Sequence, residues 1–486
     1  MKILFATSEA VPFCKTGGLA DVLGSLPKAL AAAGEETAVI MPLYNKVRDE
    51  FGDELRYLGY TYVDLAWRHE YCGVFRTERD GVSFFFLDNR RYFDRPRLYG
   101  EFDDAERFAF FSRAVTLVAD ITGFSPDIIH ANDWQTALIP VYIADENARS
   151  GRFSGVRTVF TVHNVEYQGR FGAEVLTDVC GLNEGWLADG TLAFSGDLDL
   201  MKGALITADA VTTVSPTYAR ELLSPEGAHG LDAVFRLLGG KLSGVLNGID
   251  TEDYDPATDK AISPHYAVGR MAGKAKNKEK LQGRLGMELR PETPLIVMVS
   301  RLVAHKGLDL VREVGDELLR DDVQLAVLGT GEGEYERYLE ELSRRHAGRM
   351  CFYRGYDAQL ARQMYAGADL FLMPSRSEPC GLSQLIAMRY GAVPVVRETG
   401  GLRDTVHAFE DWCGKGNGFT FAAYNAGDML YVLRQACALY REDKKKFSRV
   451  RRNAMTDDHG WARSALEYRT LYRRLCGGET DAPEKS

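Results

Sequence analysis

Short apolar runs alternate with longer segments of helical periodicity along most of the chain. This alternation is typical of α/β folds with parallel sheets. The strands predicted in the first half are 2–7, 36–41, 82–88, 126–130, 157–162 and 210–214. Segments 104–122 and 198–208 have the periodicity of helices, and segment 56–77, rich in Tyr, Val, Trp and Phe, predicts a strand or hairpin.

The same alternation restarts in the second half. Residues 295–300 form an apolar run with the composition of a strand buried in a parallel sheet. A loop over 301–306 follows, and then a helix that opens at Gly307 and runs to about residue 319. Further strands are predicted at 323–328, 350–354, 369–373 and 393–396. Because each half opens with a strand, a loop containing lysine and glycine, and a helix, we predict two Rossmann-like domains rather than one large sheet.

The domain boundary is predicted near Gly239–Gly240 or just after 246–250. We therefore expect an N-terminal domain over 1–245, a C-terminal domain over 246–458, and a final segment, 459–486. That segment contains a helix near 460–475 and ends in a polar tail that we expect to fray. The polar segment 251–293 is interpreted as a linker with one helical piece around 268–285.

Composition narrows the class of protein. The chain of 486 residues is 45% hydrophobic and 26% charged, which is typical of a globular protein with two to four domains of about 150 residues. A net charge of −10 argues against nucleic-acid binding and requires any anion site to be locally basic. We expect no membrane helix and no signal peptide, since no apolar run is long enough. Eight scattered cysteines without a CxxC pair favour a reduced, cytoplasmic protein.

The stretch Lys-Thr-Gly-Gly-Leu-Ala-Asp-Val at residues 15–22 joins the first predicted strand to a helix. Its two glycines let backbone N–H groups approach a ligand closely, and the start of a helix favours an anion. Lys15 adds a full positive charge. The residues fit a phosphate or diphosphate site, and they also fit a tight strand-to-helix turn with a surface lysine.

Ligands of doubly wound sheets bind beyond the carboxyl ends of the strands. In the second half this position holds Arg301 and Lys306, which flank the start of a helix. Two surface cations there are unfavourable for the helix dipole unless an anion is bound, so we favour an anion site.

Three other residues follow predicted strands, and each also has an ordinary structural role. Glu378 either caps a helix that starts near Leu382 or accepts a sugar hydroxyl. His163 is either a satisfied core histidine or a site residue. Asp133 is either the N-cap of a helix that starts at Trp134 or a site residue.

Several motifs occur in one order between residues 15 and 406, which is most of the chain. They are KTGGLADV, TVHNVEYQG, VSPTYARE, LNGID, SRLVAHKG, RGYD, EPCGLSQLIAMRYG and GGLRDTV. This ordered set resembles the bacterial glycogen synthase and plant starch synthase family. The resemblance implies a GT-B fold, with two Rossmann-like domains facing across a deep cleft and the C-terminal helix crossing back to the first domain. It also implies retaining transfer of glucose from ADP-glucose to the non-reducing end of an α-1,4-glucan, with release of ADP.

The resemblance further implies roles for individual residues. Those expected to be catalytic are Asp133, His163, Arg301, Lys306 and Glu378. Those expected on the donor side are Lys15, Gly18, Arg301, Lys306, Tyr356, Cys380, Gly381, Leu382 and Ser383. Those expected on the acceptor side are Asp21, Asn164 and Asn247. The expected partners are the nucleotide sugar and the glucan, with no cofactor, metal, nucleic acid or membrane, and the oligomeric state is left open.

Some positions depart from the family pattern. Asn132 and Gln135 stand where histidines are usual, and Ser383 stands where threonine is usual. Asp197 and Asp199 lie in a stretch that usually carries Gln and Asn, and Tyr254 replaces a tryptophan. These departures bear on acceptor preference and rate rather than on the class of reaction.

The alternatives are UDP-glucose as donor, a sugar-nucleotide epimerase, a glucan phosphorylase, and a non-catalytic glucan-binding or priming protein. The motif order argues against an epimerase, and no motif marks the lysine of a phosphorylase. The intact set of Lys15, Arg301, Lys306 and Glu378 argues against a decayed site. No motif clearly supplies a carboxylate nucleophile, so we expect attack by the acceptor hydroxyl on the same face of the sugar, with His163 stabilising the positive ring.

Overall fold

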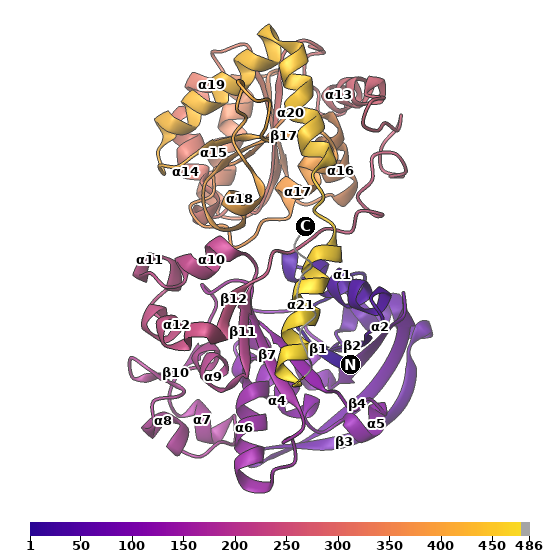
Figure 1. The fold of residues 1–486 in the computed structure, drawn as a ribbon, viewed down its shortest axis with the longest axis vertical. Helices are drawn as coiled ribbons and strands as arrows, with labels where there is room; N and C mark the ends of the chain where they lie inside the picture. The colour runs from indigo at the N-terminus through magenta and orange to yellow at the C-terminus, as the bar shows by residue number, and fades with distance from the viewer. Residues whose placement is uncertain (478–486) are drawn as a thin grey trace. The chain divides into compact units, whose positions relative to one another are not determined.

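The computed structural model describes residues 1–477, which form two units (Figure 1). The first comprises Met1–Asn247 and the segment from Trp461, and the second comprises Gly248–Gly460. The polar tail predicted to fray lies outside the described residues, apart from its first residue, Gly477. Within the described range, no helix is both long enough and apolar enough to cross a membrane.

The first unit is built on a sheet that, in the described part of the chain, has the strand order β12-β11-β7-β6-β1-β2-β5-β4-β3. Its strands are β1 (Lys2–Ala6), β2 (Glu36–Pro42), β3 (Arg56–Leu65), β4 (Arg68–Arg79), β5 (Val82–Asp88), β6 (Ile128–Asn132), β7 (Arg157–Val162), β11 (Ala210–Thr213) and β12 (Leu242–Gly244). The pairs β3·β4 and β4·β5 are antiparallel, and the other neighbours are parallel. The predicted strands of this half are confirmed to within two residues, and segment 56–77 is confirmed as a hairpin.

Helices cover this sheet, and a small second sheet has the order β8-β10-β9. The helices are α1 (Gly18–Ala32), α2 (Asn45–Phe51), α3 (Arg90–Phe93), α4 (Asp104–Val115), α5 (Ala119–Thr122), α6 (Leu138–Ser150), α7 (Val175–Asp178), α8 (Gly185–Ala188), α9 (Leu200–Thr207), α10 (Pro216–Glu221), α11 (Pro225–Ala228) and α12 (Asp232–Leu238). The small strands are β8 (Arg170–Phe171), β9 (Ala193–Phe194) and β10 (Asp197–Asp199).

Two helix predictions in this unit need correction. The single helix over 104–122 is wrong, because the chain breaks between α4 and α5. There Thr116 donates its hydroxyl to the carbonyl of Arg113 at 2.7 Å, which competes with helix continuation. The helix predicted over 198–208 begins only at Leu200, since the residues before it pair as β10.

The C-terminal helix α21 (Trp461–Leu475) belongs to the first unit and packs on α1 (Figure 1). Its Tyr472 hydroxyl lies 2.7 Å from Nδ1 of His130, which is fully buried in β6. Arg469 adds an ion pair with Glu35 at 2.8 Å. The helix predicted near 460–475 is therefore confirmed, and buried polar contacts hold it against the sheet of the first unit.

The second unit contains a parallel sheet with the order β15-β14-β13-β16-β17-β18 in the described residues. Its strands are β13 (Leu295–Val299), β14 (Gln324–Gly329), β15 (Met350–Arg354), β16 (Leu370–Met373), β17 (Val393–Arg397) and β18 (Phe419–Phe421). Its helices are α13 (Ala272–Arg284), α14 (Leu308–Leu318), α15 (Gly333–Arg345), α16 (Ala358–Gly367), α17 (Ser383–Arg389), α18 (Gly400–Thr405), α19 (Ala426–Glu442) and α20 (Lys444–Thr456). The strands predicted for this half are confirmed to within one residue.

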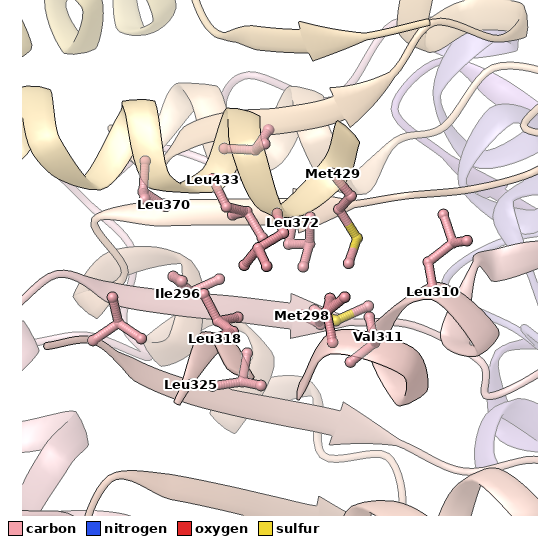
Figure 2. Close-up of a cluster of buried hydrophobic side chains, with 14 of the residues drawn as sticks. Ile296, Met298, Leu310, Val311, Leu318, Leu325, Leu370, Leu372, Met429 and Leu433 are labelled. Atoms are coloured by element: carbon pink, nitrogen blue, oxygen red, sulfur yellow. The ribbon is translucent and has the colours of Figure 1, made fainter. Parts of the chain in front are cut away.

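The core of the second unit fills the space between this sheet and its helices. Figure 2 shows Ile296 and Met298 of β13 among side chains of α14 and of α19, including Leu318 and Leu433. These residues are at most 2% exposed, so the continuous apolar strand is buried as its composition predicts. Two such parallel α/β units are the architecture of the GT-B fold that the sequence predicts.

The interpretation of 251–293 as a linker is wrong outside its helix. The helical piece is confirmed as α13, but Ile262 and Tyr266 are also buried in the core of the second unit. The Tyr266 hydroxyl donates to the carbonyl of Tyr390 at 2.8 Å. The apolar residues of this segment are too widely spaced to give a helix or strand period, so their burial is not visible in the sequence.

Candidate active site

In the first unit, the residues that follow β6 and β7 form one polar cluster. The two strands are parallel neighbours, so their carboxyl ends lie at the same edge of the sheet. The Asp133 carboxylate accepts the backbone N–H of His163 at 2.7 Å and that of Asn164 at 3.4 Å. Asp133 does not cap a helix, because a 3₁₀ turn, η2 (Trp134–Thr136), follows it and receives no side-chain cap. The capping interpretation of Asp133 is therefore wrong.

Asp133 has a strained backbone conformation and a carboxyl group with a raised pKa. Its φ of 58° lies in a region that non-glycine residues rarely adopt, which costs about 1–3 kcal/mol. Burial raises the pKa of its carboxyl to about 7, although the two amide hydrogen bonds oppose that rise. Strain and a perturbed pKa at a strand end are typical of functional sites.

A neighbouring amide fixes the orientation of the His163 ring. Asn132 donates its side-chain amide to the carbonyls of Ala6 and His130, both at 3.1 Å, so its Oδ1 faces His163. That oxygen can only accept, and it lies 2.9 Å from Nε2 of His163. His163 is therefore neutral with its proton on Nε2, and burial lowers its pKa to about 3.

The loop after β1 brings a second carboxylate to the same edge. Glu9 is 2% exposed and accepts both the backbone N–H and the hydroxyl of Thr16. Burial raises its pKa to about 7. Lys15 pairs with Asp21 of α1 at 2.7 Å, and Gly18 opens that helix. The glycine turn is thus held by a buried glutamate, and the charge of Lys15 is balanced by Asp21.

In the second unit, Lys306 and Glu378 form a half-buried ion pair. The ammonium of Lys306 lies 2.6 Å from Oε2 of Glu378, and the Ser375 hydroxyl donates to the same oxygen at 3.2 Å. The capping interpretation of Glu378 is wrong, because α17 begins at Ser383 without a side-chain cap. Gly307 follows Lys306 with a φ of 76°, and a Cβ there would lie 2.2 Å from the carbonyl oxygen of Pro374. Only glycine lets the two loops approach this closely.

Arg301 differs from the two lysines. It follows β13 and is exposed, and within residues 1–477 its guanidinium makes no hydrogen bond or ion pair. Its planar fork of donors is therefore available to an anion in the same unit that holds the Lys306–Glu378 pair. Tyr356 follows β15 and is 67% exposed, so its ring is also accessible.

The loop Cys380–Leu382 is shaped by a buried glutamine. Gln384 is fully buried and donates its amide to the carbonyls of Cys380 and Gly381, at 3.1 Å and 2.8 Å. Gly381 has a φ of 75°, which favours glycine. Ser383 begins α17 and is half-buried. In the first unit, Asn247 is buried, and its Oδ1 has no hydrogen-bond partner among the described residues.

Comparisons with known proteins identify the family of this chain. The family model "Starch synthase catalytic domain" matches residues 2–237, and the model "Glycosyl transferases group 1" matches residues 286–454. A glycogen synthase of Bacillus licheniformis is 46% identical over 480 residues, covering 99% of each chain. A glycogen synthase of Anoxybacillus flavithermus is 44% identical over 478 residues, covering 98% of this chain and 99% of the relative.

Comparison with solved structures leads to the same family. The catalytic domain of starch synthase IV from Arabidopsis thaliana, bound to ADP and acarbose, is similar with a TM-score of 0.91 and 34% identity, covering 98% of this chain and 99% of that one. The chain belongs to the glycogen synthase and starch synthase family. It is a glucosyltransferase. A sucrose-phosphate synthase of Thermosynechococcus elongatus, with a TM-score of 0.63 and 18% identity, shares the fold.

The predicted residues of this glucosyltransferase divide between the two units. Lys15, Gly18, Asp21, Asp133, His163, Asn164 and Asn247 belong to the first unit, and Arg301, Lys306, Tyr356, Glu378 and Cys380–Ser383 belong to the second. Three supporting residues were missed by sequence reasoning: Glu9, Ser375 and Gln384. The sequence held a signal for Glu9, because a carboxylate three residues after a buried strand lies where a functional residue is expected. Ser375 and Gln384 carry no such signal.

The Asp197-Leu198-Asp199 spacing has a structural explanation in part. Asp199 is fully buried, caps α9 by accepting the N–H of Lys202 at 2.9 Å, and pairs with Arg170 at 3.2 Å. Asp199 therefore has a structural role at the start of α9. No group of three or more His, Cys, Asp or Glu side chains arranged to hold a metal is found in the described part of the chain.

The pKa of Asp133 gives a testable pH dependence. Between its ordinary value of 3.8 and about 7, the folded chain holds a proton that the unfolded chain has released. This carboxyl therefore contributes stability that is fully present below about pH 4 and is lost as pH rises toward 7. We expect Asp133→Asn to gain stability relative to the original chain between about pH 4.5 and about pH 7.5, measured by urea denaturation.

Asp133→Asn and the original chain both contain His130 and His163, so the opposite pH dependence that these histidines give to stability cancels in the comparison. Burial lowers the pKa of both to about 3, so they lose stability as pH falls below 6.5. The measured quantity is the free energy of unfolding of Asp133→Asn minus that of the original chain. If this difference is equal at about pH 4.5 and about pH 7.5, or smaller at the higher pH, the result contradicts a raised pKa for Asp133.

Proposed function

We propose that the chain transfers glucose from ADP-glucose to the non-reducing end of an α-1,4-glucan, with retention of configuration and release of ADP. The observation that carries this proposal is the Lys306–Glu378 pair in the unit that also holds Arg301. A nucleotide diphosphate sugar needs cations for its phosphates and a carboxylate for its hydroxyls, and these three residues supply both. The relatives named as glycogen synthases, and the starch synthase bound to ADP and acarbose, support the same donor and acceptor classes.

Charge explains how these residues would promote the reaction. Breaking the bond between the anomeric carbon and the diphosphate leaves negative charge on the diphosphate and positive charge on the sugar ring. Arg301, Lys306 and Lys15 would stabilise the leaving group electrostatically. Lys306 and Lys15 each already face a carboxylate, whereas Arg301 has no ion-pair partner in residues 1–477 and so supplies an uncompensated positive charge.

The remaining groups are assigned to the sugar and to the acceptor. Glu378, with Cys380–Ser383, binds glucose hydroxyls and phosphate, and Tyr356 lies against the base. Asp133 and neutral His163 face the transferred glucose, and Asp21, Asn164 and Asn247 serve the acceptor side. We propose attack by the acceptor hydroxyl on the same face of the sugar, since no motif clearly supplies a carboxylate nucleophile and the two amides that bind Oδ1 of Asp133 make that carboxylate a weaker one. A cytoplasmic location is proposed from the scattered cysteines.

Glucose incorporation tests the proposed donor. Purified enzyme is incubated with glycogen and either ADP-glucose or UDP-glucose, and initial rates and released nucleotide are measured. We expect ADP-glucose to be the better donor. Faster incorporation from UDP-glucose overturns the donor assignment alone. No incorporation from either donor, with glycogen binding retained, supports the alternative of a non-catalytic glucan-binding or priming protein.

Arg301→Ala and Lys306→Ala should each lower turnover by about 10²–10³, because losing a donor to a developing anion costs about 3 kcal/mol. Lys306→Ala also leaves the buried Glu378 carboxylate unpaired, so its folding must be checked by thermal unfolding. Lys276→Ala, which removes an exposed lysine of α13, is the control and should keep full activity. Near-normal turnover in folded Arg301 and Lys306 variants contradicts the proposal that these residues bind the diphosphate.

We also propose that no divalent metal is needed, since the cations already named can neutralise the diphosphate. Activity should survive excess EDTA. The matched variant is Asp197→Asn, because Asp197 is exposed, whereas changing the buried cap Asp199 would test folding instead. The metal-free mechanism is falsified if EDTA abolishes activity, manganese or magnesium restores it, and the Asp197 variant is inactive.

A further inference from the structure

Three loops of the second unit lie at the carboxyl edge of its parallel sheet. The first carries Lys306 and leads into α14, the second carries Glu378, and the third leads from β18 into α19. The helices α14 and α19 pack against each other in the core, where Figure 2 shows Val311 and Met429. Because each helix follows a strand of one parallel sheet, both helices begin at the edge that bears the Lys306–Glu378 pair.

A backbone hydrogen bond joins the first two loops beside this pair. The N–H of Arg376 donates to the carbonyl of His305 at 2.8 Å. His305 directly precedes Lys306, and Arg376 lies two residues before Glu378. A movement of either loop therefore changes the position of one charged group relative to the other.

Side chains extend this connection to the third loop. Asp309, in the first turn of α14, accepts the hydroxyl of Tyr424 and lies 3.4 Å from the guanidinium of Arg376. The same guanidinium lies over the Tyr424 ring, 4.4 Å from its centroid. Arg397 of β17 lies over that ring at 5.5 Å and donates to the carbonyl of Arg376 at 2.7 Å. We name these four residues, Asp309, Arg376, Arg397 and Tyr424, the clamp.

Tyr424 distinguishes the clamp from an ordinary surface ion pair. The side chain of Arg376 is 62% exposed, and an exposed pair with Asp309 alone contributes little to stability. Tyr424 is half-buried and contacts both residues, Asp309 through its hydroxyl and Arg376 through its ring. Burial and the Asp309 carboxylate raise the pKa of Tyr424 to about 12, so its hydroxyl keeps its proton and donates at neutral pH. A charge-assisted hydrogen bond and a cation–π contact together hold the arginine in place.

We propose that the clamp sets the position of Lys306 and Glu378 and thereby controls how well the enzyme uses its nucleotide sugar. This rests on the proposed function, which assigns both groups to the donor. Arg376 and Tyr424 are positioning residues, because they act through the loops that bear these groups. The path is short, since Ser375, next to Arg376, donates its hydroxyl to the Glu378 carboxylate at 3.2 Å. Use of the donor should depend on the clamp, and affinity for the glucan should not.

Replacing the tyrosine tests the clamp. Tyr424→Ala removes the hydroxyl and the ring, and should lower kcat/KM for ADP-glucose about tenfold, because a charge-assisted hydrogen bond and a cation–π contact are lost. Tyr424→Phe keeps the ring and should lose about threefold. KM for glycogen, measured at saturating ADP-glucose, should stay within about twofold in both variants, which a general loss of structure would not allow. Tyr431→Ala, which removes an exposed tyrosine of α19, is the control and should leave both constants unchanged.

A second comparison separates positioning from an effect on folding. Because the clamp acts partly through Lys306, Tyr424→Ala should lower kcat/KM by no more than about threefold in a chain that already carries Lys306→Ala. An equal tenfold loss in both backgrounds overturns the proposal, since independent effects are additive. Thermal unfolding of every variant shows whether the chains compared are folded at the assay temperature.

The remaining outcomes distinguish the clamp from the proposed function. Unchanged kcat/KM in Tyr424→Ala, together with the expected loss in Lys306→Ala, refutes the clamp and leaves the donor assignment standing. Unchanged kcat/KM in Lys306→Ala refutes the donor assignment, and the clamp proposal falls with it. A rise in KM for glycogen as large as the loss in kcat/KM for ADP-glucose also contradicts the proposal, because it shows that the substitution disturbs the enzyme as a whole.

Discussion

Parallel pairing of β1 with β6, and of β6 with β7, is the constraint on which the chemistry of the first unit depends. It brings three loops that are far apart in the chain to one edge of the sheet. Glu9, Asp133 and His163 meet there because each follows the carboxyl end of its strand. At this edge Asp133 has a rare backbone conformation, and its carboxylate binds two backbone amides beyond β7.

Charge balance distinguishes the individual cations. Lys15 and Lys306 each face a carboxylate at hydrogen-bond distance, so neither brings net charge to its own unit. Arg301 makes no such pair in the part of the chain that the structure describes. An acidic chain can therefore offer an anion site without a large basic patch, because the Arg301 guanidinium in the second unit stays uncompensated among the described residues.

Buried polar residues hold the loops in shape around both groups. Glu9 binds the backbone of the glycine turn, Asn132 sets the His163 tautomer, and Gln384 binds two carbonyls of the loop after β16. Glu9, Asn132 and Gln384 are themselves buried, so losing these contacts would leave a buried polar group unsatisfied, which explains why the loops can keep a fixed geometry. Asn132 departs from the family pattern, but its side chain still orients the His163 ring.

The sequence by itself determined the two α/β units, most strand positions, the family, and the set of candidate residues, because apolar periodicity and local motifs are properties of neighbouring positions. Tertiary structure alone decided what those residues contact. It showed that Asp133 binds amides rather than capping a helix, and that Glu378 pairs with Lys306. It also showed that Ile262 is buried, although the sequence around it has neither a helix nor a strand period. Such contacts join residues from distant strands and loops, and no local pattern encodes the distance between them.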